Sequence, residues 1–391
     1  MANFYVNFFA FWVVLLFFSG HRYRYIFLWF FAVILFFNLL YLLDYGIGNV
    51  SLYVSDEAVF QRAGVGLDEL AVKDRILWIK LNQIVRFPLS EFDFSGKYIG
   101  FIFLPIYVYS LISVVRDKRF LLFFPMFFPF IFYCFQLNLR DSAILSLTLL
   151  FFSGLKSSKK TAKLLQLAIS LGGMLYLRPF MAIVLIMSYF FSYFIAYALN
   201  GGIFKANSIL KILIFFVLSS VVLYFLGIPD VFERYYLRVL YLSEEGVQTL
   251  DGKIMAPDIN FIIYSFFRFI FTPIPVSLVE RLITDGFTEW GWVHDISRII
   301  SQFFYFLFSI AIFLVFCFSP KRFFSALKEI FVSPTVSGLL ICSLFVALVY
   351  GFYYGGGGHS RTKILNYHFV YIIVYYLYIS PRLPNRDVAR V

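Results

Sequence analysis

Two short apolar runs joined by a lysine-rich turn constrain the fold of this chain more than any other feature. The runs cover residues 142–154 and 164–177, and the turn between them carries Lys156, Lys159, Lys160 and Lys163. As helices, runs of 13 and 14 residues reach only about 20 Å, whereas the hydrocarbon core of a bilayer is about 30 Å thick. If the lysines stay in cytoplasmic water, the shortfall draws Arg140, Asp141 and Arg178 below the opposite surface.

Charges at that depth are expected to face protein or a wet cavity and to avoid lipid. One interpretation is that Arg140 and Asp141 pair at a helix end while Arg178 extends toward the headgroups. The other is an anion-binding cavity that opens to the outer side. The sequence leaves both interpretations open.

The composition predicts an all-α, polytopic integral membrane protein. Of 391 residues, 61% are hydrophobic and only 14% are charged. The net charge of +11 comes from basic residues in short loops, where they report orientation, so nucleic acid is not expected as a partner. The three cysteines, Cys134, Cys317 and Cys342, lie inside apolar runs without the spacing of a disulfide framework or a zinc site. We therefore expect no metal site built from them.

Eleven apolar segments are predicted as spans of a single transmembrane domain over residues 1–391. They cover residues 4–19, 26–43, 98–115, 120–135, 142–154, 164–177, 180–199, 212–227, 299–318, 331–350 and 364–380. The first precedes its basic residues, unlike a signal peptide, and is expected to be retained. The loops assigned to the cytoplasm hold 17 Lys and Arg residues against 3 acidic ones. This asymmetry predicts an outer N-terminus and a cytoplasmic C-terminus.

The first long extracytoplasmic loop, residues 44–96, carries the acidic pair Asp56 and Glu57 followed by Arg62. A carboxylate there could orient a sugar hydroxyl or accept its proton, and we favour Asp56 by position. A solvated amphipathic helix with alternating charges is the alternative interpretation. Downstream, the apolar pattern of residues 76–85 with Trp78 predicts a helix on the membrane surface, acting as a lid or an anchor.

The second long extracytoplasmic loop, residues 228–298, contains an apolar stretch, residues 261–278, interrupted by Arg268 and two prolines. We expect this stretch to be re-entrant or to lie in the interface. Arg268 then needs an acidic partner, a ligand anion or a route to the headgroups. Trp290 and Trp292 are typical of an interface belt, although tryptophans also stack on sugar rings.

The third extracytoplasmic loop, residues 351–363, combines four consecutive glycines with His359, Arg361 and Lys363. Exposed backbone N–H groups and cations suit a phosphate, although a flexible connector is the alternative. No Walker pattern is present. A lipid diphosphate would match the outer-side cations as a set, because arginine forks can stabilise a departing diphosphate without a metal. No cofactor is expected, and the use of a divalent metal by Asp56 and Glu57 stays open.

The chain resembles the Wzy-type repeat-unit polymerases of bacterial O-antigen and capsule synthesis. The resemblance rests on the number of spans, the two long outer loops and three arginine motifs: Asn138-Leu139-Arg140-Asp141, Leu177-Arg178-Pro179 and the Gly-rich loop with Arg361. It implies an inner-membrane glycosyltransferase, related to the GT-C class, that moves a growing glycan from undecaprenyl diphosphate onto an incoming lipid-linked repeat unit. A chain-length regulator would be a partner, and lipopolysaccharide or capsule the product.

By this resemblance, the diphosphates would be held by Arg140, Arg178, Arg268 and Arg361. Asp56 or Asp141 would position or deprotonate the acceptor hydroxyl, and Glu57, Arg62, His359 and Lys363 would contribute to substrate binding. The alternative is a GT-C-type enzyme that uses a polyprenyl-phosphate sugar, which the Asp56-Glu57 pair also resembles. A third candidate is a non-enzymatic carrier of a lipid-linked glycan, but its cations should line a path through the bundle and not gather on the outer side.

Overall fold

A computed structural model describes residues 24–48, 76–86, 98–115, 118–137, 139–199, 247–248, 254–255, 259–354 and 360–378. The chain forms two compact units. The first comprises Met1–Arg178 and Ile274–Phe306, and the second comprises Pro179–Pro273 and Leu307–Val391. The predicted spans 4–19 and 212–227 lie outside the described residues. So do four predicted site residues: Asp56, Glu57, Arg62 and His359.

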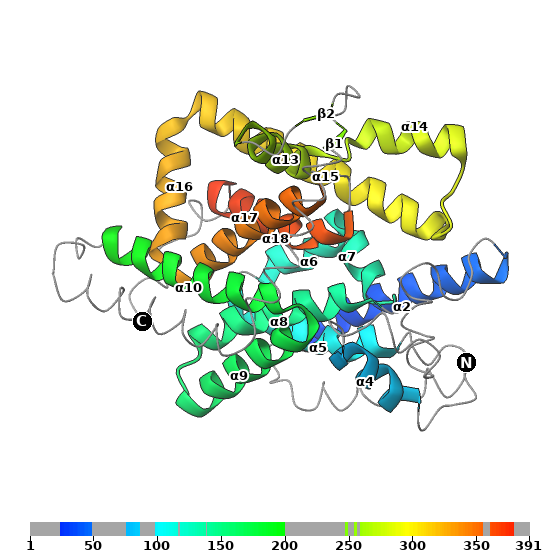
Figure 1. The fold of residues 1–391 in the computed structure, drawn as a ribbon, viewed down its shortest axis with the longest axis horizontal. Helices are drawn as coiled ribbons and strands as arrows, with labels where there is room; N and C mark the ends of the chain where they lie inside the picture. Colours follow the sequence, from blue (N-terminus) through cyan, green and yellow to red (C-terminus); the bar gives the residue numbers. More distant parts are fainter. Residues whose placement is uncertain are drawn as a thin grey trace. The chain divides into compact units, whose positions relative to one another are not determined.

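The described residues are almost entirely helical, which confirms the all-α class of a membrane protein (Figure 1). The exception is a short antiparallel ribbon of β1 (Val247–Gln248) and β2 (Ile254–Met255). Within the described part of the chain, four helices are long and apolar enough to cross a membrane. They are α2 (Arg24–Gly46), α10 (Pro179–Leu199), α15 (Gly291–Phe318) and α17 (Pro334–Tyr354). The count of eleven spans stays a prediction.

The centre of the first unit is α8 (Arg140–Lys156), which packs against α5 (Tyr98–Val114) and α9 (Lys160–Leu177). Every residue of α8 from Ser142 to Gly154 is buried. Small residues let such helices approach closely, and Gly173 of α9 accordingly lies against the side chain of Leu147. The predicted short hairpin is therefore part of a three-helix group in which α8 lies between α5 and α9.

Charged residues extend both helices of the hairpin beyond the apolar runs. α8 and α9 contain 17 and 18 residues, about 26 Å of helix each. Lys156 Nζ donates a hydrogen bond to the carbonyl of Ser113 near the end of α5 at 2.7 Å. The last carbonyls of a helix have no intrahelical partner, so the lysine satisfies one of them. Its positive charge is also favourable at the C-terminal end of the helix dipole. The lysines lie at one end of the hairpin, and Arg140 and Arg178 lie at the other.

The stretch predicted as the span over residues 120–135 is not one continuous helix, because two helices, α6 (Lys118–Phe127) and α7 (Pro129–Cys134), occupy it. That it crosses the membrane stays a prediction. Pro129 has no backbone N–H to continue the helix, and it disfavours the α conformation at the preceding residue. Phe128 accordingly has φ −127° and ψ 58°. The N–H of Phe130 is donated to Ser301 Oγ of α15 at 3.0 Å. The break thus anchors α7 on the first part of α15.

The helix predicted in the first long loop is present as α4 (Ile76–Arg86). Its Trp78 is fully buried and stacks on Phe103 of α5, with ring centroids 6.0 Å apart. Asn82, one turn later, is also buried and donates to the Trp78 carbonyl. This face of α4 packs on protein, whereas Ile84 is exposed. The location of α4 on the membrane surface stays a prediction.

In the second unit, α10 and α13 (Ile259–Phe271) pack along α17. A Cβ atom at Gly351 of α17 would stand 2.9 Å from the carbonyl oxygen of Ser265, so glycine permits the close approach of α13. α13 ends near Pro273, and α14 (Pro275–Asp285) follows. The interruption lies where the proline pair predicted it.

One helix boundary differs from the predictions, and one helix was not predicted. α15 begins at Gly291, eight residues before the predicted span, and α16 (Pro320–Val332) occupies a stretch that had been interpreted as a cytoplasmic loop. Proline at the first position of a helix is favourable, because its missing N–H would have no intrahelical partner there. Arg322 of α16 donates through Nε and Nη2 to the carbonyl of Leu377 in α18 (Ile364–Tyr378). This contact ties α16 to the end of α18.

Candidate functional site

The first candidate site is the arginine cluster, defined here as Arg140, Asp141 and Arg178. Arg140 and Asp141 open α8, and Arg178 ends α9 directly before Pro179. A residue that precedes proline is disfavoured in the α conformation, and Arg178 has φ −161° and ψ 85°. The Arg-Pro dipeptide therefore stops α9 at the level where α8 begins.

The contacts within the arginine cluster differ from the pairing that adjacency in sequence suggests. Arg178 Nη1 lies 3.9 Å from Asp141 Oδ1. Arg140 Nη1 donates to the carbonyl of Leu177 at 2.9 Å. The last carbonyls of a helix have no intrahelical partner, so a guanidinium there is favourable. The interpretation in which Arg140 pairs with Asp141 and Arg178 extends toward the headgroups does not describe these contacts.

The arginine cluster has the charges to bind an anion and remains partly accessible. The side chains of Arg178 and Asp141 are 12% and 16% exposed, so neither is sealed from a ligand. The 3.9 Å separation exceeds the roughly 2.7–2.9 Å of a charge-assisted hydrogen bond. The two guanidiniums supply positive charge and paired donors that suit phosphate oxygens, while Asp141 offers a carboxylate acceptor for a hydroxyl.

The predicted residues of the second unit adopt a different arrangement. Lys363, at the end of the 3₁₀ helix η4 (Ser360–Lys363), is fully buried and donates from Nζ to the Ile270 carbonyl at 3.3 Å. Its ammonium also lies 5.3 Å from the centre of the Phe269 ring. A positive charge at the C-terminal end of α13 interacts favourably with the negative end of the helix dipole. This contact gives Lys363 a structural role, and its binding to substrate stays a prediction.

Arg268 also makes a local contact within α13. Its guanidinium carbon lies 5.9 Å from the centre of the Tyr264 ring, one turn earlier, and Thr272 Oγ1 donates to the Arg268 carbonyl. Arg361 is partly buried in η4. The arginine cluster belongs to the first unit, whereas Arg268, Arg361 and Lys363 belong to the second.

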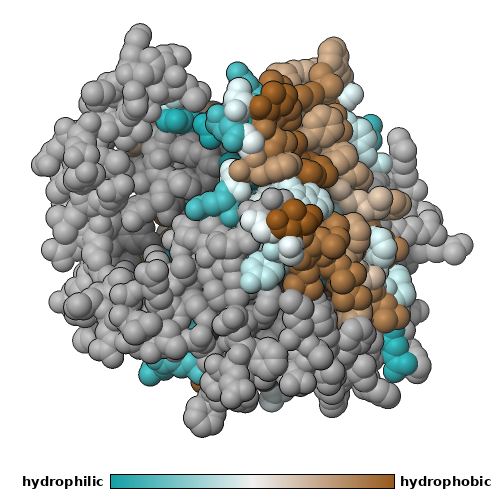
Figure 2. Space-filling model, turned by 90° about the vertical axis from the view of Figure 1, so that its right-hand side faces the viewer, coloured by the Kyte–Doolittle hydropathy of each residue, from teal (hydrophilic) through white to brown (hydrophobic). Residues whose placement is uncertain are grey.

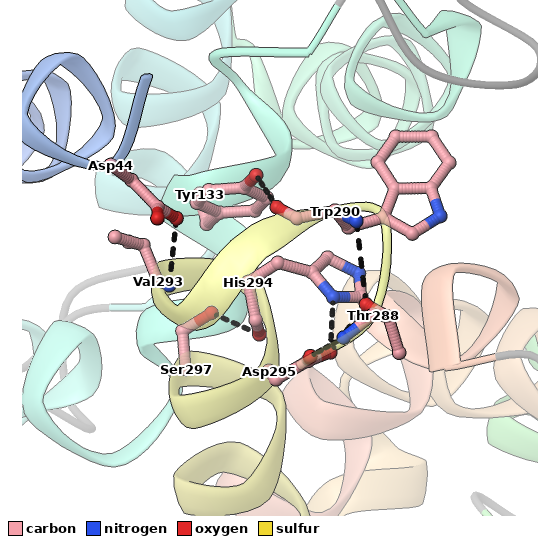
Figure 3. Close-up of polar contacts among 8 residues, drawn as sticks. All are labelled: Asp44, Tyr133, Thr288, Trp290, Val293, His294, Asp295 and Ser297. Atoms are coloured by element: carbon pink, nitrogen blue, oxygen red, sulfur yellow. Dashed lines mark hydrogen bonds and ion pairs between the residues drawn. The ribbon is translucent and has the colours of Figure 1, made fainter. Parts of the chain in front are cut away.

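A second group of polar residues, which was not predicted from the sequence, is the histidine cluster, defined as Thr288, His294 and Asp295 (Figure 3). His294 Nδ1 lies 2.8 Å from Asp295 Oδ1. Asp295 also accepts hydrogen bonds from the Thr288 N–H at 2.7 Å and the Thr288 hydroxyl at 2.9 Å. The carboxylate thus joins the first turns of α15 to the segment that precedes the helix.

Aromatic rings surround the imidazole of His294. The ring centres of Phe130, Tyr133 and Trp290 lie 5.3, 5.5 and 5.6 Å from it, with Trp290 stacked. The Tyr133 hydroxyl donates to the Trp290 carbonyl at 3.1 Å (Figure 3). A carboxylate that orients an imidazole is a common element of both acid–base and metal sites. Within the described ranges, however, no group of three or more His, Cys, Asp or Glu residues could hold a metal ion.

Another carboxylate, that of Asp44 at the end of α2, reaches the same region. Its Oδ2 accepts the backbone N–H of Val293 at 3.4 Å (Figure 3). The adjacent His294-Asp295 dipeptide at the start of a long apolar run was the signal available in the sequence, since ionisable residues within a span are functional candidates. It was overlooked because the segment was interpreted as an interface belt, and the start of α15 was placed too late.

No family model, curated protein or solved structure matches this chain. The fold and the residues themselves therefore define the class, which is that of a helical membrane protein.

Proposed function

We propose that this protein is a glycosyltransferase of the bacterial cytoplasmic membrane that polymerises undecaprenyl-diphosphate-linked oligosaccharide repeat units, as in O-antigen or capsule synthesis. The observation that supports the proposal is the arginine cluster. Arg140 at the start of α8 and Arg178 at the end of α9 gather around Asp141 at the end of the hairpin opposite its lysines.

The chemistry that this cluster suits is transfer of a glycan from a diphosphate to a hydroxyl. The acceptor oxygen forms a bond to the anomeric carbon, and the bond between that carbon and the diphosphate oxygen breaks with its electron pair. Arg140 and Arg178 then stabilise the negative charge of the departing diphosphate. Asp141 orients the acceptor hydroxyl and takes its proton.

The proposed topology has eleven spans, an outer N-terminus and a cytoplasmic C-terminus. The lysine end of the α8–α9 hairpin then faces the cytoplasm, as the distribution of basic residues favours. The arginine cluster is on the outer side in this arrangement, where the resemblance to Wzy-type polymerases implies that lipid-linked repeat units are joined.

The proposal is tested by the glycan ladder of cells in which the gene is deleted and then restored. Restoration with Arg140→Ala or Arg178→Ala should give membrane-inserted protein and a glycan that stops at one repeat unit. Lys160→Ala is the matched control, because this exposed cation lies at the other end of α9. It should restore the full ladder.

Two outcomes would contradict the proposal. Normal ladders from both arginine variants would remove the role of the cluster. A deletion strain in which every repeat unit lacks one sugar would indicate instead a GT-C-type transferase that uses a polyprenyl-phosphate sugar donor. Purified protein incubated with undecaprenyl-diphosphate-linked repeat units provides the direct assay of polymerisation.

A further inference from the structure

The amphipathic helix α14 (Pro275–Asp285) has one apolar flank that packs on the protein and one that does not. At about 100° per residue, its apolar side chains occupy one half of the helix circumference: Val276, Leu278, Val279, Leu282 and Ile283. Leu278 is only 7% exposed, whereas Val276, Val279 and Ile283 are 72%, 40% and 79% exposed. We define these last three residues as the open flank. The opposite half of the circumference is polar.

The depth of α14 in a membrane follows from the helix after it. α15 contains 28 residues, about 42 Å of helix, which exceeds the roughly 30 Å of a hydrocarbon core. Its polar side chains gather in its first twelve residues: His294, Asp295, Ser297, Arg298, Ser301 and Gln302. Beyond Gln302 the helix is apolar to Phe318, apart from Ser309. The start of α15 therefore belongs at the level of the headgroups.

The connection between the two helices is short and fixed. Gly286, with φ 76°, ends α14, and α15 begins five residues later. Asp295 holds Thr288 of this connection through two hydrogen bonds, at 2.7 and 2.9 Å. The C-terminal end of α14 is thereby placed at the polar end of α15, which is headgroup depth.

The first half of α15 also exposes apolar side chains. Ile296, Ile300 and Phe303 are exposed on α15. Figure 2 faces the side of Figure 1 on which α14 and the start of α15 lie, and it shows hydrophobic residues gathered on this face with paler and hydrophilic residues beside them. Lipid is the solvent of the exposed apolar face of a membrane span, so lipid also meets the neighbouring flank of α14.

We propose that α14 lies at the boundary of the bilayer, with the open flank among the upper acyl chains and its polar half toward water. Helices with this pattern bind the boundary between headgroups and acyl chains. A protein partner is the weaker match, because a stable interface uses about 20 residues per side and the open flank offers three. This inference does not depend on the proposed enzymatic function.

The test is collision of a spin label with reagents that partition differently. Cys134 and Cys342 are buried, so only the exposed Cys317 is first replaced by serine. Single cysteines at Val276, Val279 and Ile283 are then labelled in the full chain, in phospholipid nanodiscs. Glu280→Cys and Thr284→Cys are matched controls from the polar half of the same helix, where both residues are exposed. The Cys317→Ser protein without a further substitution gives the background labelling.

We expect the ratio of collisions with oxygen to collisions with a water-soluble nickel chelate to be several-fold higher at the three open-flank positions than at the two controls. Frequent collision with nickel at Val276, Val279 and Ile283 would overturn the proposal, because that flank would face water. Shielding from both reagents, with dipolar coupling between labels when a disc holds two chains, would assign the flank to a second copy and also overturn it. Because all five positions are exposed, the substitutions should not prevent folding, and monodisperse elution verifies this.

Discussion

A close backbone approach in the first unit gives a sharp prediction for Gly100→Ala. A Cβ atom at Gly100 of α5 would stand 2.1 Å from the carbonyl oxygen of Phe135 and 3.2 Å from that of Leu137. Carbon and carbonyl oxygen atoms in contact are normally about 3.3 Å or more apart. The substitution therefore requires α5 and the segment after α7 to separate by about 1.2 Å.

The magnitude follows from the kind of atom that must move. A side chain could rotate away from the new methyl group, but a main-chain carbonyl cannot, so we expect the upper end of overpacking costs, about 3 kcal/mol. Alanine is intrinsically better than glycine within a helix by about 1 kcal/mol. The net loss in the free energy of unfolding is then about 2 kcal/mol.

Gly172→Ala in α9 is the matched control, because nothing lies within 4 Å of a Cβ atom built there. This variant should keep or gain up to about 1 kcal/mol, so the two variants should differ by about 3 kcal/mol. The measurement is reversible unfolding by SDS in mixed micelles, followed by tryptophan fluorescence. If Gly100→Ala and Gly172→Ala unfold at the same SDS fraction, the reasoning from close backbone approach is refuted.

Two further variants test hydrogen bonds that join distant elements. Asp295→Ala should lower the free energy of unfolding by about 1–3 kcal/mol, because Thr288 and His294 lose their acceptor. Asp295→Asn should lose less of this free energy in the same SDS titration. Equal stability of the two variants and the unsubstituted protein would contradict the role of this carboxylate. Arg322→Ala should speed amide hydrogen exchange in the last turn of α18, because the Leu377 carbonyl loses the two donor nitrogens of this guanidinium. Arg322→Lys should give an intermediate exchange rate. Unchanged exchange in both variants would show that the contact does not stabilise the helix end.

Much of the helical architecture could be predicted from the sequence. The helices α2, α5, α9 and α10 follow apolar runs, whose lengths and flanking charges are local properties of the chain. The proline pair after Arg268 likewise predicted the break between α13 and α14. Such features need no knowledge of packing, because proline chemistry and hydrophobic length act within a few residues.

The errors arose where a tertiary contact decides the outcome. The broken helix at Pro129 is stabilised by Ser301, which is 171 residues away from Phe130 in the sequence. The helix over residues 76–85 was predicted, but the burial of Trp78 was not, because it depends on the packing of α4 against α5 and α9. Apolar periodicity predicts that one face of a helix avoids water, but it does not indicate whether lipid or protein covers that face.

The sequence by itself determined a helical membrane protein and a hairpin with lysines at one end and arginines at the other. Only the tertiary structure decided that Asp141 pairs with Arg178, 37 residues later, and that Arg140 instead binds the Leu177 carbonyl. The same holds for Thr288, which joins His294 and Asp295 to form the histidine cluster. The physical reason is that helix formation depends on neighbours within one or two turns, whereas the partner of a charge depends on which helix ends meet when the helices pack.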